Sequence, residues 1–251
     1  KNLEKIFKKK KIGKIIHLAA QAGVRYSINN PEKYLYSNTI GFFNIIELSR
    51  KYKINKIIYA SSSSVYGNSK NFPLSEKDKI NPNNFYGLSK KNNEEMASIY
   101  SKYYKIQFVG LRLFTVYGEW GRPDMSIFKL IDCSFRKKIF HLNNHGNHHR
   151  DFTYIGDVVK MIKKIKFNKN FRNEIFNISS NNPIKLTKLI SIISKYIIIP
   201  KIKKRELQKA DVLKTHGDNK KIRNITNFKK FTSFNIGLFN TVNWYKKYFN
   251  F

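Results

Sequence analysis

The sequence predicts an α/β protein with a doubly wound parallel sheet, followed by a smaller C-terminal cap. Short apolar segments alternate with long segments of helical periodicity, and small or polar residues follow each apolar segment. This alternation is typical of parallel strands joined by helical crossovers. It predicts strands over residues 14–18, 55–60 and 107–113, and long helices over residues 31–52 and 86–105.

The elements of the first half follow in order from their patterns. Residues 1–10 are expected to form a basic helix, and residues 14–18 a short buried strand. Pro31 suits the first turn of a helix because its fixed φ is already helical. The positions of that helix at core-facing spacing are Phe42, Ile45, Ile46 and Ser49. The next long helix is expected to turn Met96, Ile99, Tyr100 and Tyr103 inward.

The second half is less regular and predicts a cap. It contains a helical pattern near residues 125–136, a short strand, a loop rich in His and Asn, and mixed elements ending in an aromatic amphipathic helix. We therefore expect one domain over residues 1–117 and a second, substrate-binding domain over residues 118–251, some elements of which return to the first.

Composition excludes several classes of protein. The chain has 251 residues with 41% hydrophobic content, enough for a sizeable core. It contains no apolar run of the length that a membrane span needs and no signal peptide pattern. The single cysteine, Cys133, permits no internal disulfide and fits a reducing compartment, so a cytoplasmic protein is expected.

The formal net charge of +33 invites a nucleic-acid partner. The lysines, however, are spread along the whole chain, and no nucleic-acid-binding motif is present. A basic nucleic-acid-binding protein therefore remains an alternative, not the main hypothesis. Four histidines fall within residues 141–149, but no cysteine or spaced carboxylate joins them in a known ligand pattern. A solvated loop is expected there, and no metal site.

Two segments carry the chemistry. A run of four serines, residues 61–64, directly follows the second strand, where ligands bind in parallel sheets. Tyr86 and Lys90 lie four residues apart at the start of a helix and so share one face. A nearby ammonium favours the phenolate form of a tyrosine, whose pKa is otherwise about 10. Such a trio suits removal of a proton from an alcohol while a hydride leaves the same carbon.

With these motifs, the chain resembles the extended short-chain dehydrogenase/reductase family, and within it the NAD-dependent nucleotide-sugar 4-epimerases. The resemblance is greatest to the UDP-glucuronate 4-epimerase branch. It rests on residues 17–27, 111–125 and 150–155, and more weakly on residues 208–212. It implies a Rossmann-like fold and NAD as the cofactor.

The resemblance also implies roles for individual residues. Tyr86 would take the proton of the sugar C4 hydroxyl, Ser62 would be the catalytic serine, and Lys90 would hold the nicotinamide ribose and lower the pKa of Tyr86. Ala19 and Ala20 would join Tyr86 and Lys90 in contacting NAD. The substrate would be a UDP-hexuronate, held by Ser63, Ser64, Thr115, Arg25, Arg122 and Arg150.

Of these, Ser63, Ser64 and Thr115 would hold the hexuronate carboxylate. Arg122 and Arg150 would contact the diphosphate or uridine ribose, because the guanidinium is a fixed fork of donors. Arg25 contacts the substrate or only caps a loop. The family's two long helices imply a homodimer.

The family's glycine-rich turn after the first strand is absent from the sequence, so we expect the first βαβαβ portion to be missing. This expectation has several consequences. The strand near residues 15–18 should have an exposed edge, and the fragment should be poorly soluble. Without the pyrophosphate-binding turn, the fragment alone should bind NAD weakly and have little activity.

Two alternatives stay open within and outside the family. One is a related epimerase or a 4,6-dehydratase, although dehydratases carry an Asp-Glu pair where this chain has Ser63 and Ser64. The other is the basic nucleic-acid-binding protein.

Overall fold

The computed structural model describes residues 2–168, 170–209 and 211–251. Position 210, within the weakest of the four resembling blocks, lies outside the described residues. The chain forms two compact units. The first runs to Leu113 and includes residues 166–177, and the second comprises residues 114–165 and 178–251. The chain therefore passes from the first unit to the second after Leu113, four residues before the predicted boundary, and passes between them twice more.

The first unit contains a sheet whose strand order is β1-β2-β3-β7. Its strands are β1 (Ile15–His17), β2 (Lys56–Ser62), β3 (Gln107–Leu113) and β7 (Asn173–Ile178). The pairs β1–β2 and β2–β3 are parallel, with His17 beside Tyr59 and Ser62 beside Leu113. The predicted parallel α/β sheet is confirmed, and the carboxyl ends of its strands lie at one edge.

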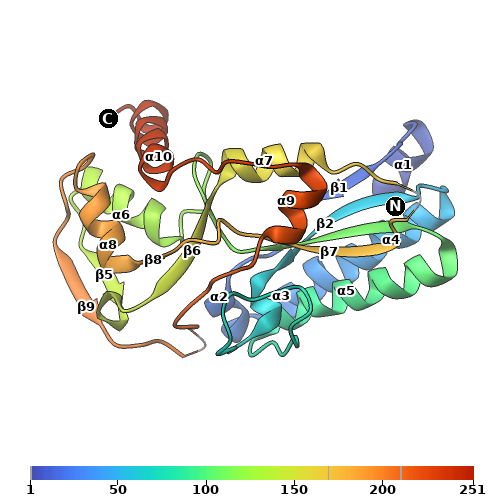
Figure 1. The fold of residues 1–251 in the computed structure, drawn as a ribbon, viewed down its shortest axis with the longest axis horizontal. Coiled ribbons are helices and arrows are strands. Elements are labelled where there is room, and N and C mark those ends of the chain that lie inside the picture. Colours follow the sequence, from blue (N-terminus) through green and yellow to red (C-terminus); the bar gives the residue numbers. More distant parts are fainter. Residues whose placement is uncertain (1, 169, 210) are drawn as a thin grey trace. The chain divides into compact units, whose positions relative to one another are not determined.

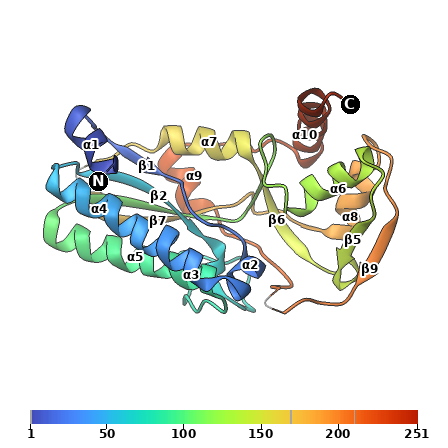
Figure 2. The ribbon, with the colours of Figure 1, turned by 180° about the vertical axis from the view of Figure 1, so that it is seen from behind.

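Helices α4 and α5 lie side by side along one face of this sheet (Figures 1 and 2). The helical segments of the unit are α1 (Asn2–Lys9), α2 (Val24–Asn29), α3 (Pro31–Tyr34), the π-helix η1 (Leu35–Ile40), α4 (Gly41–Lys51), the 3₁₀ turn η2 (Ser63–Tyr66) and α5 (Phe85–Tyr104). The predicted helix over residues 31–52 is thus a continuous series of three segments. Phe42 and Ile46 of α4 pack with Ile57 and Tyr59 of β2 in the core.

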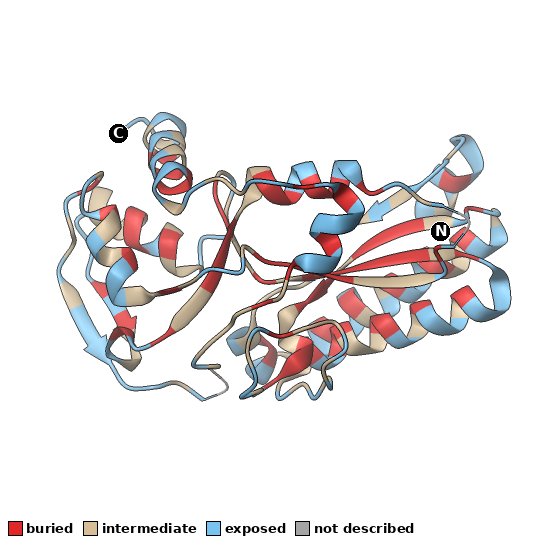
Figure 3. Ribbon diagram, viewed as in Figure 1, coloured by how far each residue is buried: buried red, intermediate tan, exposed pale blue. Residues whose placement is uncertain are grey.

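The predicted inward face of α5 is wrong in part. Met96 and Tyr100 pack against the core, but Ile99 is 54% exposed and Tyr103 is 67% exposed. The buried residues of α5 are Gly87, Ser89, Lys90, Asn93, Glu94, Ala97 and Ser101, and Figure 3 shows this face in red against the sheet. Small side chains let the helix approach the sheet closely. Ser89, Lys90 and Glu94 form hydrogen bonds, whereas the buried Oδ1 of Asn93 has no hydrogen-bond partner among the described residues. The hydrophobic pattern of the sequence therefore predicts the wrong buried face for part of α5.

Strand β1 is the outer strand of the sheet order, so the exposed edge near residues 15–18 is confirmed. The expectation that this strand is buried is wrong, because Ile16 is 47% exposed and Leu18 is 50% exposed. The side chains of an edge strand have neighbouring strands on one side only, so fewer neighbouring side chains cover them than cover those of an interior strand.

The second unit is built on two small sheets. Strands β4 (Thr115–Tyr117), β6 (His149–Tyr154) and β8 (Pro183–Lys185) form one sheet, and β5 (Phe140–Asn143) pairs in parallel with β9 (Ile202–Arg205). The helical segments are α6 (Ser126–Phe135), η3 (Asn144–Gly146), α7 (Ile155–Lys164), α8 (Leu186–Ile193), α9 (Lys220–Thr226) and α10 (Phe234–Phe249). Leu130, Ile193, Leu238 and Tyr245 lie in its core, so the predicted amphipathic tail helix is confirmed.

The histidine-rich stretch forms β5, η3 and the start of β6. His148 is buried, so the expectation of a solvated loop is wrong for that residue. Among the described residues, no group of three His, Cys, Asp or Glu side chains is arranged to hold a metal ion. None of the described helices combines the length and the apolarity that crossing a membrane requires.

Candidate active site

The serine run continues β2 into a tight turn. Ser61 and Ser62 are buried at the end of the strand, and Ser63 begins η2. The hydroxyl oxygen of Ser62 accepts a hydrogen bond from the backbone N–H of Ser64 at 3.1 Å, which caps this turn. Because that bond uses a lone pair, the hydroxyl proton of Ser62 remains available for donation.

The start of α5 is fixed against the serine turn. The side chain of Asn84 accepts a hydrogen bond from the N–H of Gly87 at 2.8 Å, which caps the helix and places Tyr86 in its first turn. At Gly87, a Cβ atom would lie 2.5 Å from the carbonyl oxygen of Ser64. Glycine therefore permits an approach between helix and turn that any other residue would prevent.

Lys90 lies one helical turn after Tyr86, with only 3% of its surface exposed. Its ammonium donates a hydrogen bond to the carbonyl oxygen of Ala60 at 2.8 Å. Burial lowers the pKa of Lys90 from 10.5 to about 8. Burial, and then the charge of Lys90, also lower the pKa of His17 at the end of β1. The ammonium has two further N–H donors beyond the one that Ala60 receives.

The π-helical segment η1 and the residues before it support Tyr86. The ring of Tyr34 lies edge-on to that of Tyr86, with ring centres 6.0 Å apart. Asn38 donates to the hydroxyl of Ser89 at 3.0 Å, and Ser89 in turn donates to the carbonyl oxygen of Tyr86 at 2.8 Å. A π-helical turn is rare and often occurs at a functional site.

The other predicted binding residues of the first unit, Ala19, Ala20 and Arg25, lie outside the serine turn and the start of α5. Ala19 and Ala20 are exposed and follow β1 after Leu18. Tyr34 donates to the carbonyl oxygen of Gly23 at 2.5 Å, so the segment after Ala20 is tied to the same helical series. Arg25 lies on α2 and is exposed. The first unit therefore brings together Ser62, the Ser63–Ser64 turn, Lys90 and the start of α5.

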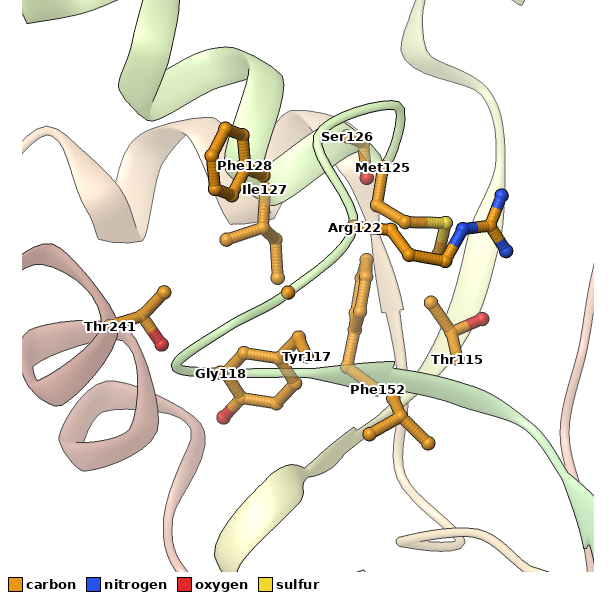
Figure 4. Close-up of a pocket in the computed structure, with 12 residues that line it drawn as sticks. Thr115, Tyr117, Gly118, Arg122, Met125, Ser126, Ile127, Phe128, Phe152 and Thr241 are labelled. Carbon is orange, nitrogen blue, oxygen red and sulfur yellow. The ribbon is translucent and has the colours of Figure 1, made fainter. Parts of the chain in front are cut away.

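The predicted substrate residues of the second unit fall into two groups. Thr115 and Arg122 line one pocket, together with Tyr117, Phe128 and Phe152. In Figure 4, Thr115 and Arg122 lie on the same side of this pocket, away from Phe128. The Nε atom of Arg122 donates to Asp124 at 3.0 Å, so a phosphate at Arg122 would compete with this carboxylate.

Arg150 lies on β6, outside the residues that line this pocket. Its guanidinium donates to the carbonyl oxygens of His149 at 3.0 Å and Leu213 at 3.1 Å. Asp151, its neighbour, is fully buried and accepts hydrogen bonds from the backbone and hydroxyl of Ser180. Arg150 thus lies on a strand, and one nitrogen of its guanidinium is already hydrogen-bonded to two backbone oxygens.

The sequence prediction missed the polar residues beneath the serine run. Glu94 is buried and forms an ion pair with Arg112 at 2.8 Å. The spacing contained a signal, because Glu94 follows Lys90 by four residues and Tyr86 by eight, and so shares their helix face. Arg112 is the next-to-last residue of β3 and is buried between Leu111 and Leu113, where a cation needs a partner.

The residues present fit one end of NAD. The buried ammonium of Lys90 and the first-turn Tyr86 lie where a nicotinamide ribose would be held, at the carboxyl ends of parallel strands. The sequence contains twelve glycines but no glycine-rich turn of the kind that cradles a pyrophosphate at a helix N-terminus. The fit is therefore to the nicotinamide end.

Comparison with known proteins agrees with this geometry. Residues 1–179 match the NAD dependent epimerase/dehydratase family. An uncharacterized protein from Methanocaldococcus jannaschii is 45% identical over 95% of this chain and 73% of its own length. UDP-glucuronate 4-epimerase 4 from Arabidopsis thaliana is 37% identical over 99% of this chain, which spans 61% of that protein.

Solved structures share the fold. The UDP-glucuronic acid 4-epimerase from Bacillus cereus, in complex with UDP-glucuronic acid and NAD, has a TM-score of 0.91 and 28% identity, covering 99% of this chain and 79% of that one. A UDP-glucose 4-epimerase from Thermotoga maritima also has a TM-score of 0.91 and 28% identity, with 99% and 82% coverage. These likenesses confirm the predicted Rossmann-like α/β fold class. The chain belongs to the NAD dependent epimerase/dehydratase family.

Proposed function

We propose that this protein inverts C4 of a UDP-hexuronate, converting UDP-glucuronate to UDP-galacturonate through a 4-keto sugar. The observation that carries the proposal is the arrangement at the end of β2. There the buried Lys90 ammonium bonds to Ala60, one residue before the serine run, and Tyr86 lies on the same helix face. This arrangement suits proton removal from an alcohol.

The residues divide the work as follows. Tyr86 takes the proton of the C4 hydroxyl, and the hydroxyl of Ser62 donates a hydrogen bond to the same oxygen. Lys90 holds the cofactor ribose and stabilises the phenolate of Tyr86 by its charge. The chemistry that NAD supplies when bound is removal and return of the C4 hydride. Tyr86 returns its proton once the sugar presents its other face.

The proposal of a hexuronate substrate rests on two serine hydroxyls at positions where the dehydratases of this family carry acidic side chains. Ser63 and Ser64 form the turn directly after Ser62, and a dehydratase of this family carries an Asp-Glu pair at that point. Serine hydroxyls donate hydrogen bonds to a carboxylate, whereas acidic side chains repel it. We assign Ser63 and Ser64, with Thr115 of the second unit, to the sugar carboxylate. Arg25, Arg122 and Arg150 are assigned to the UDP portion.

An uncharged UDP-hexose is the second candidate. The structural likeness to the Thermotoga maritima UDP-glucose 4-epimerase equals that to the UDP-glucuronic acid enzyme in both TM-score and identity. A carboxylate-binding turn would accept UDP-glucose, but with weaker binding.

The test is direct conversion. The chain is assayed as given and as a fusion behind a glycine-rich NAD-binding segment, with NAD and either UDP-glucuronate or UDP-glucose. We expect the fusion to interconvert UDP-glucuronate and UDP-galacturonate to an equilibrium mixture, resolved by anion-exchange chromatography. A fusion that binds NAD but converts neither sugar contradicts the proposal.

We also propose a cytoplasmic homodimer, in which a second copy covers the outer face of α4 and α5. Tyr103 and Ile99 of α5 are exposed large apolar residues, as are Phe43 of α4 and Ile40 and Tyr36 of η1. These helices lie side by side, so the exposed side chains belong to one helix pair. Two copies of such a pair form a four-helix interface that removes this apolar surface from water.

A further inference from the structure

A buried ion pair lies beneath the serine run. The Glu94 carboxylate of α5 accepts two hydrogen bonds from the guanidinium of Arg112 on β3, at 3.0 and 2.8 Å. It also accepts one from the hydroxyl of Ser61, at 2.5 Å. All three residues are buried. The fork of Arg112 thus binds the carboxylate with both its Nε and one terminal nitrogen, the most directional form of ion pair.

The remaining nitrogen of Arg112 extends the network. It donates to the hydroxyl of Tyr66 at 2.9 Å, and Tyr66 donates to the side chain of Asn177 at 2.7 Å. The backbone N–H of Asn177 donates to Glu76 at 2.8 Å. The network therefore joins the end of β2, the turn η2, helix α5 and the two strands β3 and β7.

Two side chains of one helix face anchor α5 to successive residues of β2. Lys90 bonds to the carbonyl of Ala60, and Glu94, one turn later, bonds to the hydroxyl of Ser61. The next residue of the strand is Ser62. Two anchors one turn apart fix both the rotation of the helix and its position along its axis. Tyr86 lies on the same face, one turn before Lys90. These two anchors therefore fix the position of the Cα atom of Tyr86.

Stability alone does not account for this pair. The desolvation of two buried charges offsets much of their attraction, and well-packed apolar residues often serve as well or better. Burial by itself would lower the pKa of Arg112, yet the hydrogen bonds and charge of Glu94 outweigh it and raise that pKa. Arg112 therefore stays protonated, and what its contact with Glu94 adds over an apolar contact is a fixed direction.

We propose that Glu94 and Arg112 are positioning residues, which hold α5 and the serine turn in the register that brings Tyr86, Lys90 and Ser62 to one point. This inference rests on the proposed function for the roles of those three residues. Neither Glu94 nor Arg112 is placed in contact with the substrate or the cofactor. Both act through the backbone of β2 and α5.

The test compares Glu94→Gln and Ser61→Ala with the control Glu95→Gln. Glu95 is adjacent on α5 but pairs with Lys91 at 3.6 Å on the outer side of the helix. Hydrogen exchange, read by mass spectrometry, is expected to quicken at least tenfold for residues 62–66 and 85–90 in Glu94→Gln, and less in Ser61→Ala. Exchange in α10 should be unchanged, and the control should match the unaltered protein throughout.

Activity provides the second measurement. In the epimerising protein, Glu94→Gln should lower kcat about 10- to 100-fold with KM within about twofold. The acidic limb of its kcat profile should move to higher pH, toward the value of about 10 for a free tyrosine, as Lys90 loses its register with Tyr86. A purely structural role would change the melting temperature without moving that limb. Glu94→Gln/Arg112→Met removes both charges and keeps the test possible if the single variant fails to fold.

The outcomes separate the two proposals. Exchange, kcat and pH profile equal to the control, in a folded single or double variant, overturn the positioning role. Local quickening of exchange in a protein that epimerises no UDP-sugar supports the anchoring of α5 while overturning the proposed function.

Discussion

The ammonium of Lys90 donates a 2.8 Å hydrogen bond to the carbonyl oxygen of Ala60, the residue that precedes the serine run. One contact thus joins the helix that carries Tyr86 to the strand that ends in Ser62. It also removes the charged ammonium from water, which lowers the free energy of unfolding by an amount that can be measured.

That cost should depend on pH. Burial lowers the pKa of Lys90 from 10.5 to about 8, so between these values the unfolded chain holds the proton more tightly than the folded chain does. The free energy of unfolding contributed by Lys90 therefore rises with pH across this window. Below about pH 8 the full free-energy cost of burying the charged ammonium applies. Above pH 10.5 the amine is neutral in both states, and this cost is absent.

The variant Lys90→Met should remove this dependence. Its free energy of unfolding, relative to the unaltered protein, should be most favourable below about pH 8 and should fall steadily toward pH 10.5. Urea denaturation across that range measures it. Lys91→Met, at a side chain that is 33% exposed, serves as the control and should show no such trend. A pH-independent difference for Lys90→Met would refute the assignment.

Tyr86→Phe should remove the proton acceptor and leave the fold intact. We expect kcat to fall by about 10²- to 10⁴-fold, the usual contribution of a positioned acid or base. Initial rates of UDP-galacturonate formation measure this effect, and the melting temperature of the protein without ligand should be retained. Tyr103→Phe, at an exposed position of the same helix, is the matched control. An unaltered rate in Tyr86→Phe would rule out the mechanism.

Gly87→Ala should separate α5 from the serine turn. The added Cβ would lie 2.5 Å from the carbonyl oxygen of Ser64, so helix or turn must move. We expect a loss of about 1–3 kcal/mol in the free energy of unfolding and a fall in kcat of at least tenfold. Gly13→Ala is the control, because nothing lies within 4 Å of a Cβ at that position. Equal behaviour of the two variants would show that the close approach has no role.

Ser63→Ala and Ser64→Ala should alter substrate choice. Each removes one hydroxyl, and the backbone N–H of Ser64 that bonds to Ser62 is kept. A hydrogen bond to a charged group contributes about 1.5–3 kcal/mol, so KM for UDP-glucuronate should rise about tenfold or more. The rate with UDP-glucose should change little, as should both rates in the control Ser69→Ala. A parallel loss with both sugars would argue against a carboxylate-binding role.

Tyr103→Glu should yield a monomer. A charge in the centre of an apolar helix interface costs more than the interface gains, whereas the same charge on a solvated surface costs little. Sedimentation equilibrium measures the mass, with Asn243→Glu, at an exposed position of α10, as the control. A dimer that persists in Tyr103→Glu would place the interface elsewhere.

How far the sequence alone predicts this protein differs between elements. Strand β3 occupies the predicted residues, since its short run of mostly apolar side chains is buried within the sheet. The same reasoning misassigned Ile99 and Tyr103 on α5, since hydrophobic periodicity identifies an apolar face but not what covers it. Lys90 and Glu94 are buried because each has a specific partner, and a partner such as Arg112, eighteen positions from Glu94, cannot be read from local pattern.

The division of the chain also determines how the protein can be dissected. The chain crosses between the compact units at residues 113–114, 165–166 and 177–178. No single cleavage therefore releases either unit as one continuous polypeptide, and a fragment ending at Leu113 would lose β7 and the Asn177 contact of Tyr66. A recombinant first unit needs residues 166–177 spliced onto Leu113 through an artificial linker.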